Sequence, residues 1–351
     1  MDFRALALIG SSSLKSCVDG VAIEELGTTK NNVHPTVSDF DDVHYSLAED
    51  MHEDWLCVLA AENVQRISDA VEWDHTFLTT AAVEYIFTVC VRLRLPQEVK
   101  YSAALIFNDF MLTHVDDLYQ IVHESGHPNG SKQIEWERVE TNLSRQTTLR
   151  ILSAIQIASK LHSFHDSLSR RMVKLCLKTL GYAYTEDSVM RSEVRILKSL
   201  DWKVSCRHIP LVYAETLLKM LERRLTEKFN AATYWQFTLL CMDCVFMFWD
   251  DILKRMLINV LGSAANNFPK SRLCRVRADW MLLGAGVIAA AASCADGVVM
   301  ADQVIVQLHE ICGTPQDDIT DMCVAILEFV IEKEKKKDKT TPNLRDVITG
   351  R

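Results

Sequence analysis

The side chains with the clearest capacity for chemistry are a lysine and a glutamate in two different predicted helices. Lys160 ends the run LRILSAIQIASKL (149–161), which is apolar on almost every side of a helix. Glu193 stands four residues after Val189 and three before Ile196, so its carboxylate falls on the apolar face of its helix. An unpaired charge there would cost roughly several kcal/mol. We therefore expect a cation beside Glu193, and Lys160 is the best candidate.

The pattern leaves three roles open for this pair. Lys160 and Glu193 could form an ion pair that stabilises the fold. Lys160 could instead offset the partial negative charge at the end of its own helix. The pair could also lie on a surface that binds a partner. Residue pattern alone favours the two structural roles.

The helix that carries Lys160 is expected to lie in the middle of a helical bundle. Its side chains include the apolar stripe Ile151, Ala154, Ile155, Ala158 and Leu161. Ser153, Gln156 and Lys160 follow one another at i, i+3 and i+7, which places them in a narrow polar seam. We expect only this seam to be exposed.

Other reactive groups give weaker signals. The sequence holds no P-loop, GxGxxG, GxSxG or HExxH motif. HSFH (His162, His165) and CMDC (Cys241, Cys244) have metal-ligand spacing but no second half, and the two cysteines lie in an apolar run, which favours buried thiols. We therefore expect no catalytic residues, no metal site and no cofactor.

Composition indicates an all-α protein. The 351 residues are 48% hydrophobic, with only 12 glycines and 7 prolines, and alternating strand-like runs are rare. The eleven cysteines are scattered through apolar stretches without a recognisable secretory signal, which is typical of reduced thiols in the cytosol or nucleus. The apolar run 280–295 is shorter than a membrane span and is interpreted as a buried helix, so no membrane association is expected.

The net charge of −9 is unevenly distributed. Residues 1–54 hold eleven acidic and three basic side chains, a balance of −8, which leaves about −1 for the rest of the chain. A near-neutral body with an acidic leader is not typical of a general nucleic-acid binder. Direct contact with nucleic acid is therefore not expected.

The chain is expected to repeat one helical plan. Helices are predicted over 51–67, 77–93, 99–115, 149–161, 169–180, 186–200, 233–249 and 280–295, another begins at Pro210, and an exposed loop is expected over 123–133. The end of the 280–295 helix echoes the end of the 149–161 helix, and the matching serines, Ser159 and Ser293, lie 134 residues apart. A glycine, a threonine cap and acidic residues then follow in both halves, which favours a duplicated architecture.

The segments IASKL, GYAYTEDSVMRSEVRILKSLDWKV and PLVYAETLL, in this order, resemble the cyclin family. The resemblance is densest over 145–220 and extends over about 50–330. It implies that Lys160 and Glu193 contact each other and a kinase backbone, with Leu161 beside them at the partner-binding surface. Two features differ from cell-cycle cyclins: Leu161-His162-Ser163 replaces an aromatic-Glu-Glu sequence, and TAAVEYIF, with Tyr85, replaces the tryptophan-containing substrate-docking motif.

The resemblance implies a cyclin-like fold with two tandem helical cyclin boxes. The expected organisation is an acidic, largely disordered leader (1–45), a first box (50–208), a second, divergent box (209–332) and a charged tail (333–351). Meiotic members of the family imply a non-catalytic regulator that promotes maturation of crossover intermediates. Its expected partners are a cyclin-dependent kinase and/or meiotic crossover proteins, in the nucleus on meiotic chromosomes, with the cytoplasm as a second compartment.

A DNA-contacting, transcription-factor-like cyclin fold is the alternative. Arg170, Lys174 and Lys178 follow one another at i, i+4 and i+8 and form a basic helix face, which Arg171 extends. Without aromatic residues between them, a solvated helix face is the simpler interpretation.

Overall fold

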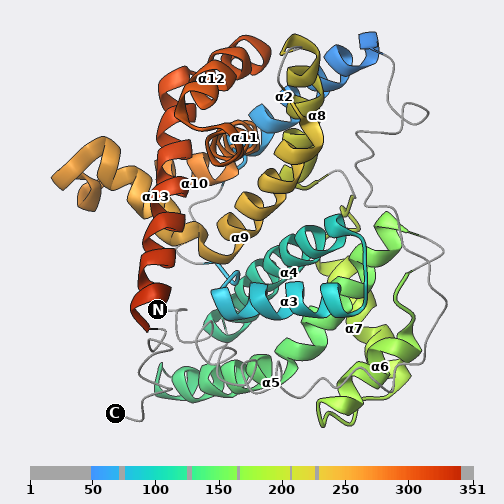
Figure 1. Ribbon diagram of the computed structural model, residues 1–351. Coiled ribbons are helices and arrows are strands. Elements are labelled where there is room, and N and C mark those ends of the chain that lie inside the picture. The colour runs from blue at the N-terminus through green and yellow to red at the C-terminus, as the bar shows by residue number, and fades with distance from the viewer. Residues whose placement is uncertain are drawn as a thin grey trace, which may run out of the picture. The chain divides into compact units, whose positions relative to one another are not determined.

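The computed structural model describes residues 49–70, 76–124, 129–163, 167–205, 208–225 and 229–340. Every regular element in these ranges is a helix, so the predicted all-α class is confirmed (Figure 1). The α-helices are α2 (Glu49–Ser68), α3 (Thr80–Arg92), α4 (Gln97–Glu124), α5 (Asn129–His162), α6 (Arg170–Thr179), α7 (Glu186–Ser199), α8 (Pro210–Arg224), α9 (Ala231–Leu261), α10 (Lys270–Ala278), α11 (Trp280–Asp296), α12 (Val298–Cys312) and α13 (Gln316–Thr340). A short 3-10 helix, η2 (Gly262–Asn267), follows α9.

The chain divides into two compact units. Among the described residues, 76–209 form the first unit, and 49–70 together with 210–340 form the second. The division at Pro210 lies next to the predicted start of the second box at residue 209. The predicted leader falls outside the described residues, and α13 extends through the described part of the predicted tail, to Thr340.

The first unit is built around the C-terminal half of α5, which packs against α3, α4, α6 and α7. From Leu149 to Ser159 the helix is buried on all sides. Side-chain caps fix where its neighbours begin: the hydroxyls of Thr79, Ser169 and Thr185 accept hydrogen bonds from the first turns of α3, α6 and α7. Thr185 is the threonine cap that the sequence predicts after the first glycine, Gly181, and it is thereby confirmed.

The second unit is built in the same order around α11, which packs against α8, α9, α12 and α13. Figure 1 shows α11 end-on beside these neighbours. The helix is buried from Trp280 to Ala292, as the sequence predicts for 280–295. Gly181 in the first unit and Gly313 in the second both have positive φ, +81° and +72°, at matching helix ends. Two units with one helix order give a cyclin-like, duplicated fold.

Helix α2 packs in the second unit, against α8, α10 and α11, although the sequence placed it within 50–208. The reason is a buried asparagine. Asn63 Oδ1 accepts hydrogen bonds from the backbone N–H groups of Trp280 (2.9 Å) and Met281 (3.4 Å), and its amide donates to Asp279 (2.9 Å). The guanidinium of Arg66 lies 3.3 Å from the centre of the Trp280 ring. The bonds to Asn63 give hydrogen-bond partners to backbone N–H groups in the first turn of α11, which have no partner within the helix.

Helix lengths differ from the sequence prediction in three places. The loop expected over 123–133 is wrong for all of its described residues, because α4 continues to Glu124 and α5 begins at Asn129 and runs without a break to His162; residues 125–128 lie outside the described ranges. Helix α4 extends to Glu124 and α9 to Leu261. In α9 the backbone departs from helical geometry at Phe248 (φ −136°, ψ 31°), so the predicted 233–249 segment is the part before a kink.

One long helix is apolar enough to cross a membrane by length and composition. It covers Ala231–Ala265, has a mean hydropathy of 1.2 in its most apolar window, and 44% of that window is buried. Helix α11 reaches the same threshold only jointly with α10, from which it is bent by 65°. A core helix of a soluble protein passes the same test, and α9 places eleven side chains in the core of its unit.

Candidate partner surface at the end of helix α5

Lys160 and Glu193 meet in the first unit. Lys160 is exposed and directly follows the enclosed part of α5, and Glu193 lies on α7, which packs against α5. Lys160 Nζ forms an ion pair and hydrogen bond with Glu193 Oε1. The lysine side chain is 42% exposed and the glutamate side chain 13% exposed. The structure therefore forms the expected pair at the rim of the unit, with one half-buried member and one exposed member.

A buried polar cluster fixes the register of α5 against α7. Arg150 Nη1 donates to Ser192 Oγ at 2.8 Å, and Nη2 donates to Gln146 Oε1 at 2.8 Å. Ser153 Oγ lies 2.8 Å from both Ser192 Oγ and the Leu149 carbonyl. Because Ser192 immediately precedes Glu193, these bonds determine where the carboxylate is presented to Lys160.

The chain after α5 is held by the serine of the ASK motif. Ser159 Oγ donates to the Gln156 carbonyl (2.8 Å) and accepts from the backbone N–H of Leu168 (2.9 Å). His162 Nε2 lies 2.7 Å from Ser102 Oγ on α4. Burial lowers the pKa of His162 to about 4, which keeps the ring neutral at physiological pH. Lys160 is thus the only cation on this final turn.

The predicted polar seam is not exposed, which corrects the expectation for Ser153 and Gln156. Both residues are fully buried, and only Lys160 reaches solvent. Ser153 is satisfied by Ser192, whereas neither polar atom of the Gln156 amide has a hydrogen-bond partner. Spacing alone showed that these side chains share one face, but it did not show that α7 covers that face.

Apolar groups lie on α5 and α7, the two helices that carry the ion pair, and on α6, which packs against both. Leu161 is half-buried beside Lys160, while Met190 on α7 and Leu175 on α6 are 38% and 39% exposed. Arg170 Nη1 contacts Met190 Sδ at 3.2 Å, so α6 and α7 present these side chains along one boundary. An exposed ammonium with free donor capacity, a carboxylate and nearby apolar groups suit the binding of a partner backbone.

Tyr85 offers no comparable surface. It is 1% exposed within α3, and its ring is among the largest fully buried side chains of the described residues. The sequence already differs here from the tryptophan-containing docking motif of cell-cycle cyclins, and this position is part of the core.

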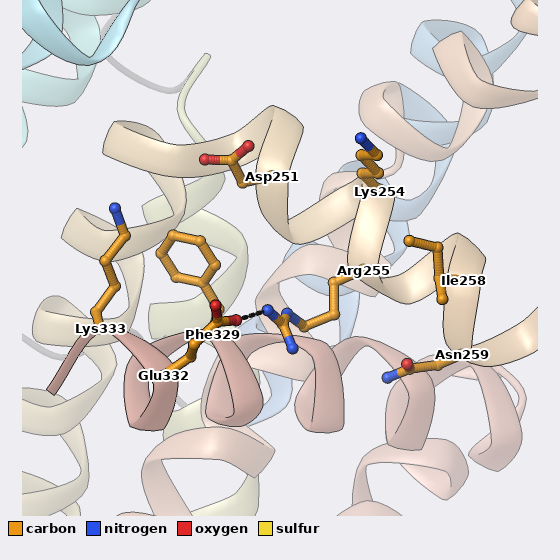
Figure 2. Close-up of a pocket in the computed structure, with 8 residues that line it drawn as sticks. All are labelled: Asp251, Lys254, Arg255, Ile258, Asn259, Phe329, Glu332 and Lys333. Atoms are coloured by element: carbon orange, nitrogen blue, oxygen red, sulfur yellow. Dashed lines mark hydrogen bonds and ion pairs between the residues drawn. The ribbon is translucent and has the colours of Figure 1, made fainter. Parts of the chain in front are cut away.

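A groove in the second unit lies between α9 and α13 (Figure 2). Its cavity volume is about 390 Å³. Arg255 forms ion pairs with Glu332 and, at 3.7 Å, with Glu328. Lys333 Nζ lies 4.2 Å from the centre of the Phe248 ring, next to the kink in α9. These contacts hold the two helices together, and Arg255 and Glu332 pair across the groove.

The sequence favours buried thiols, which is confirmed for Cys241 but not for Cys244, whose side chain is half-buried. Cys90, Cys176, Cys241 and Cys323 are buried, but Cys57 and Cys294 are exposed. Among the residues that the structure describes, no group of three or more histidine, cysteine or acidic side chains is arranged to hold a metal ion. The sequence pattern missed Cys294 because the run 280–295 is apolar throughout, which gives no sign that its last turn leaves the core.

The enclosed helix of each unit and the shared helix order form a cyclin-like fold. The chain is 29% identical over 281 residues to mouse Cyclin N-terminal domain-containing protein 1, covering 78% of this chain and 82% of that protein. It is 28% identical over 287 residues to the human protein of the same name, covering 80% and 84%. No protein-family model matches the chain. The resemblance to the cyclin family is confirmed.

Proposed function

We propose that this chain is a non-catalytic, cyclin-like regulator of meiotic recombination that promotes the maturation of crossover intermediates. In this proposal Lys160, Glu193 and Leu161 bind a cyclin-dependent kinase and/or meiotic crossover proteins. The protein acts in the nucleus on meiotic chromosomes, with the cytoplasm as a second compartment, and without association with a membrane.

The observation that carries the proposal is the unequal exposure of the two side chains in the ion pair. An ion pair with an exposed member contributes little to stability, and the Lys160 side chain is 42% exposed. Glu193 is held in place by the Ser192 cluster, so the pair is oriented before any partner arrives. The names of the mouse and human relatives, which include a cyclin N-terminal domain, support a binding role of this kind.

Charge reversal separates a partner surface from a structural ion pair. We would compare the wild-type chain with Lys160→Glu and with the double variant Lys160→Glu/Glu193→Lys in affinity pull-downs from meiotic tissue. The double variant restores an ion pair in the opposite orientation. Lys219→Glu is the matched control, because Lys219 forms an ion pair with Glu215 at 2.7 Å in the second unit. Circular dichroism and thermal melting would establish that all four chains are folded.

The proposal predicts that a kinase or crossover protein is lost from Lys160→Glu and remains lost from the double variant, while Lys219→Glu retains it. Recovery of the partner by the double variant would identify the pair as structural. Retention by Lys160→Glu itself would place the binding surface elsewhere on the chain.

Contact with DNA is a second candidate function, because basic side chains on α7 add to the basic face of α6. Arg170, Arg171, Lys174 and Lys178 are exposed on α6, and Arg191, Arg195 and Lys198 are exposed on α7. Trp202, which follows α7, is 61% exposed and supplies the aromatic side chain that the sequence pattern lacked. Lys174 is partly neutralised by Glu186 at 3.4 Å.

Fluorescence anisotropy with a labelled DNA duplex tests this candidate. DNA contact predicts an affinity that falls steeply as salt rises, with a shallower salt dependence for Arg171→Glu/Lys178→Glu. The absence of measurable affinity at low salt would exclude it.

A further inference from the structure

The groove between α9 and α13 in the second unit has most of its negative charge already paired. Arg255 forms ion pairs with both Glu328 and Glu332, so these two carboxylates are neutralised from within the groove. The other carboxylate that lines the groove, Asp251, has no such partner in the described part of the chain. One uncompensated negative charge therefore remains on the groove walls.

Two lysines that line the same groove have no carboxylate partner among the described residues. They are Lys254 on α9 and Lys333 on α13, and both are exposed. The Lys333 ammonium lies 4.2 Å from the centre of the Phe248 ring and 5.2 Å from that of Phe329. These rings position the ammonium group and leave its N–H donors available. In Figure 2 both ammonium groups point away from the paired side chains.

The groove also has an apolar surface. Ile258 is 49% exposed on α9, and Phe329 lines the opposite wall on α13. Phe329 is only 6% exposed, which leaves no ring face on which a nucleobase could stack. Two free ammonium groups beside an exposed aliphatic side chain suit an acidic peptide that carries its own aliphatic residue.

The N-terminal part of this chain contains a segment of that chemistry. The predicted acidic leader (1–45) holds seven acidic and three basic side chains, a balance of −4. Within it, DGVAIEEL (19–26) has three acidic residues, no basic residue, and the bulky aliphatic residues Val21, Ile23 and Leu26. Its charge and its apolar side chains both complement the groove.

The leader joins the second unit near the beginning of α13. His52 Nδ1, in the first turn of α2, lies 3.3 Å from the Arg223 guanidinium on α8. The next residue, Arg224, forms an ion pair at 3.3 Å with Glu310 on α12, and α13 begins six residues after that glutamate. Glu332, in the groove, is 16 residues further along α13, which corresponds to about 24 Å.

The length of the linker selects the segment that can reach the groove. The 22 residues between Leu26 and Glu49, where α2 begins, span up to about 75 Å when extended. The other acidic cluster, SDFDD (38–42), is followed by only six linking residues, which span at most about 24 Å and leave no slack. The linker therefore favours 19–26.

We propose that the leader segment 19–26 binds in the groove between α9 and α13. Its glutamates pair with Lys254 and Lys333, and Ile23 packs against Ile258. The contact lies within the second unit and its own leader, so it is independent of the partner surface at the end of α5.

Carbodiimide cross-linking of the full chain tests the proposal, because this reagent joins a carboxylate to an amine only where the two are in contact. The product would be digested and mapped by mass spectrometry. The expected link joins the peptide that contains Glu24 and Glu25 to a peptide that contains Lys254 or Lys333. Its yield should fall severalfold when salt is raised to about 1 M, since exposed charges supply part of the attraction. A mixture of isotope-labelled and unlabelled chains would show whether the link forms within one chain.

Substitutions that keep every reactive group test the apolar contact. Ile23→Ser in the leader and Ile258→Ser in the groove should each reduce the yield of the link severalfold, although all glutamates and lysines remain. Val299→Ser is the matched control and should leave the yield unchanged, because Val299 is 76% exposed on α12 and does not line the groove. Circular dichroism would establish that the three variants are folded.

Competition with the segment itself provides an independent measurement. A fluorescent peptide of residues 18–28 would be titrated with the full chain and followed by anisotropy. In the wild-type chain the tethered leader competes with this peptide at an effective concentration on the order of 1 mM. For an intrinsic Kd on the order of 0.1 mM, Ile23→Ser should bind the peptide about tenfold more tightly than the wild-type chain. Ile23→Ser/Ile258→Ser should lose this gain.

Several results would overturn the proposal. Links spread evenly over the lysines, or an unchanged yield in folded Ile258→Ser, would show that the groove does not hold the leader. A link found only between labelled and unlabelled chains would make a second copy the occupant. Equal peptide binding by the wild-type chain and Ile23→Ser would show that the tethered segment does not compete. Loss of the link on addition of a short DNA duplex, but not of the peptide, would assign the groove to nucleic acid.

Discussion

The enclosed helices of the two units, α5 and α11, solve the same packing problem by different means. Each is buried on all sides and ends in an exposed residue that follows a matching serine: Lys160 after Ser159, and Cys294 after Ser293. The buried part of α5 contains Arg150, Ser153 and Gln156, whereas α11 contains glycine and alanine at much of its length. The first unit therefore positions its neighbours by directional hydrogen bonds, and the second by close approach.

The difference matters for what each helix end can do. Hydrogen bonds fix α7 in one register, which is required to hold a carboxylate opposite Lys160. Close approach brings α9 and α13 against α11, whose buried glycines and alanines leave room for them. One helix order is thus held by directional polar contacts in the first unit and by small side chains in the second.

The largest expected effect tests the close approach in the second unit. A Cβ at Gly286 would lie 2.3 Å from Met322 Cγ and 2.7 Å from Met322 Cβ, so α13 must shift. Gly286→Val should lower the free energy of unfolding by about 3 kcal/mol. Chemical denaturation would measure this, with Gly130→Val as control, because a Cβ at Gly130 meets nothing within 4 Å. Equal effects of the two substitutions would contradict the packing argument.

The hydrogen-bonded register of the first unit can be tested at Ser192. Ser192→Val leaves the Arg150 guanidinium and the Ser153 hydroxyl without this partner and should destabilise the unit by about 2 kcal/mol. Ser199→Val, on the same helix, is the matched control because the Ser199 hydroxyl has no hydrogen-bond partner. If both variants unfold at the same denaturant concentration, the polar cluster does not stabilise α7.

Much of the fold could be predicted from sequence because its signals are local. Thr185, Gly181 and Pro210 mark helix ends by backbone chemistry that depends on few neighbours. Glu193 could be paired with Lys160 because an isolated charge on an apolar face requires a counterion. The argument identified the pair, although whether the pair binds a partner stays a prediction.

The parts that could not be predicted depend on contacts between distant segments. The placement of α2 in the second unit rests on Asn63 reaching residues 280 and 281, more than 200 positions away. The burial of Ser153 and Gln156 depends on α7 covering the polar seam. The clash that a side chain at Gly286 would make with Met322 arises only when α11 and α13 pack together. Helical periodicity contains none of this information.

Acid should weaken the first unit through two histidines. Burial lowers the pKa of both His114 and His162 from 6.5 to about 4. Between pH 6.5 and 4 the unfolded chain takes up protons that the folded chain does not. The part of the free energy of unfolding that depends on the two neutral rings is therefore complete above pH 6.5 and is lost as the pH falls towards 4. We expect a loss of roughly 1–2 kcal/mol across this range, measured by denaturation at several pH values. His162→Gln should reduce the slope, and an unchanged slope would assign the acid sensitivity to other groups.

A buried amide gives a prediction of opposite sign. Because neither polar atom of Gln156 has a hydrogen-bond partner, replacing the side chain with methionine of similar shape should stabilise the first unit by about 1 kcal/mol. Gln146→Met is the control, and it should destabilise, because Gln146 accepts a hydrogen bond from Arg150. Destabilisation by Gln156→Met would show that the amide makes a bond that matters to the fold.

The smallest stability effect is expected at the residue with the largest proposed effect on binding. The cost of several kcal/mol expected from sequence for an unpaired Glu193 applies to a fully buried carboxylate, but its side chain is 13% exposed and that of Lys160 is 42% exposed. Because water can reach the carboxylate once Lys160 is removed, Lys160→Ala should lower the free energy of unfolding by only about 0.5 kcal/mol. Lys219→Ala, which breaks the pair with Glu215, provides the scale for an ordinary ion pair of this kind. Denaturation curves for both variants would be compared with the pull-down results. A large loss of stability at Lys160 alone would show that the end of α5 has a structural role, like the glycines of α11. A small loss of stability together with loss of the partner would show that the end of α5 serves binding.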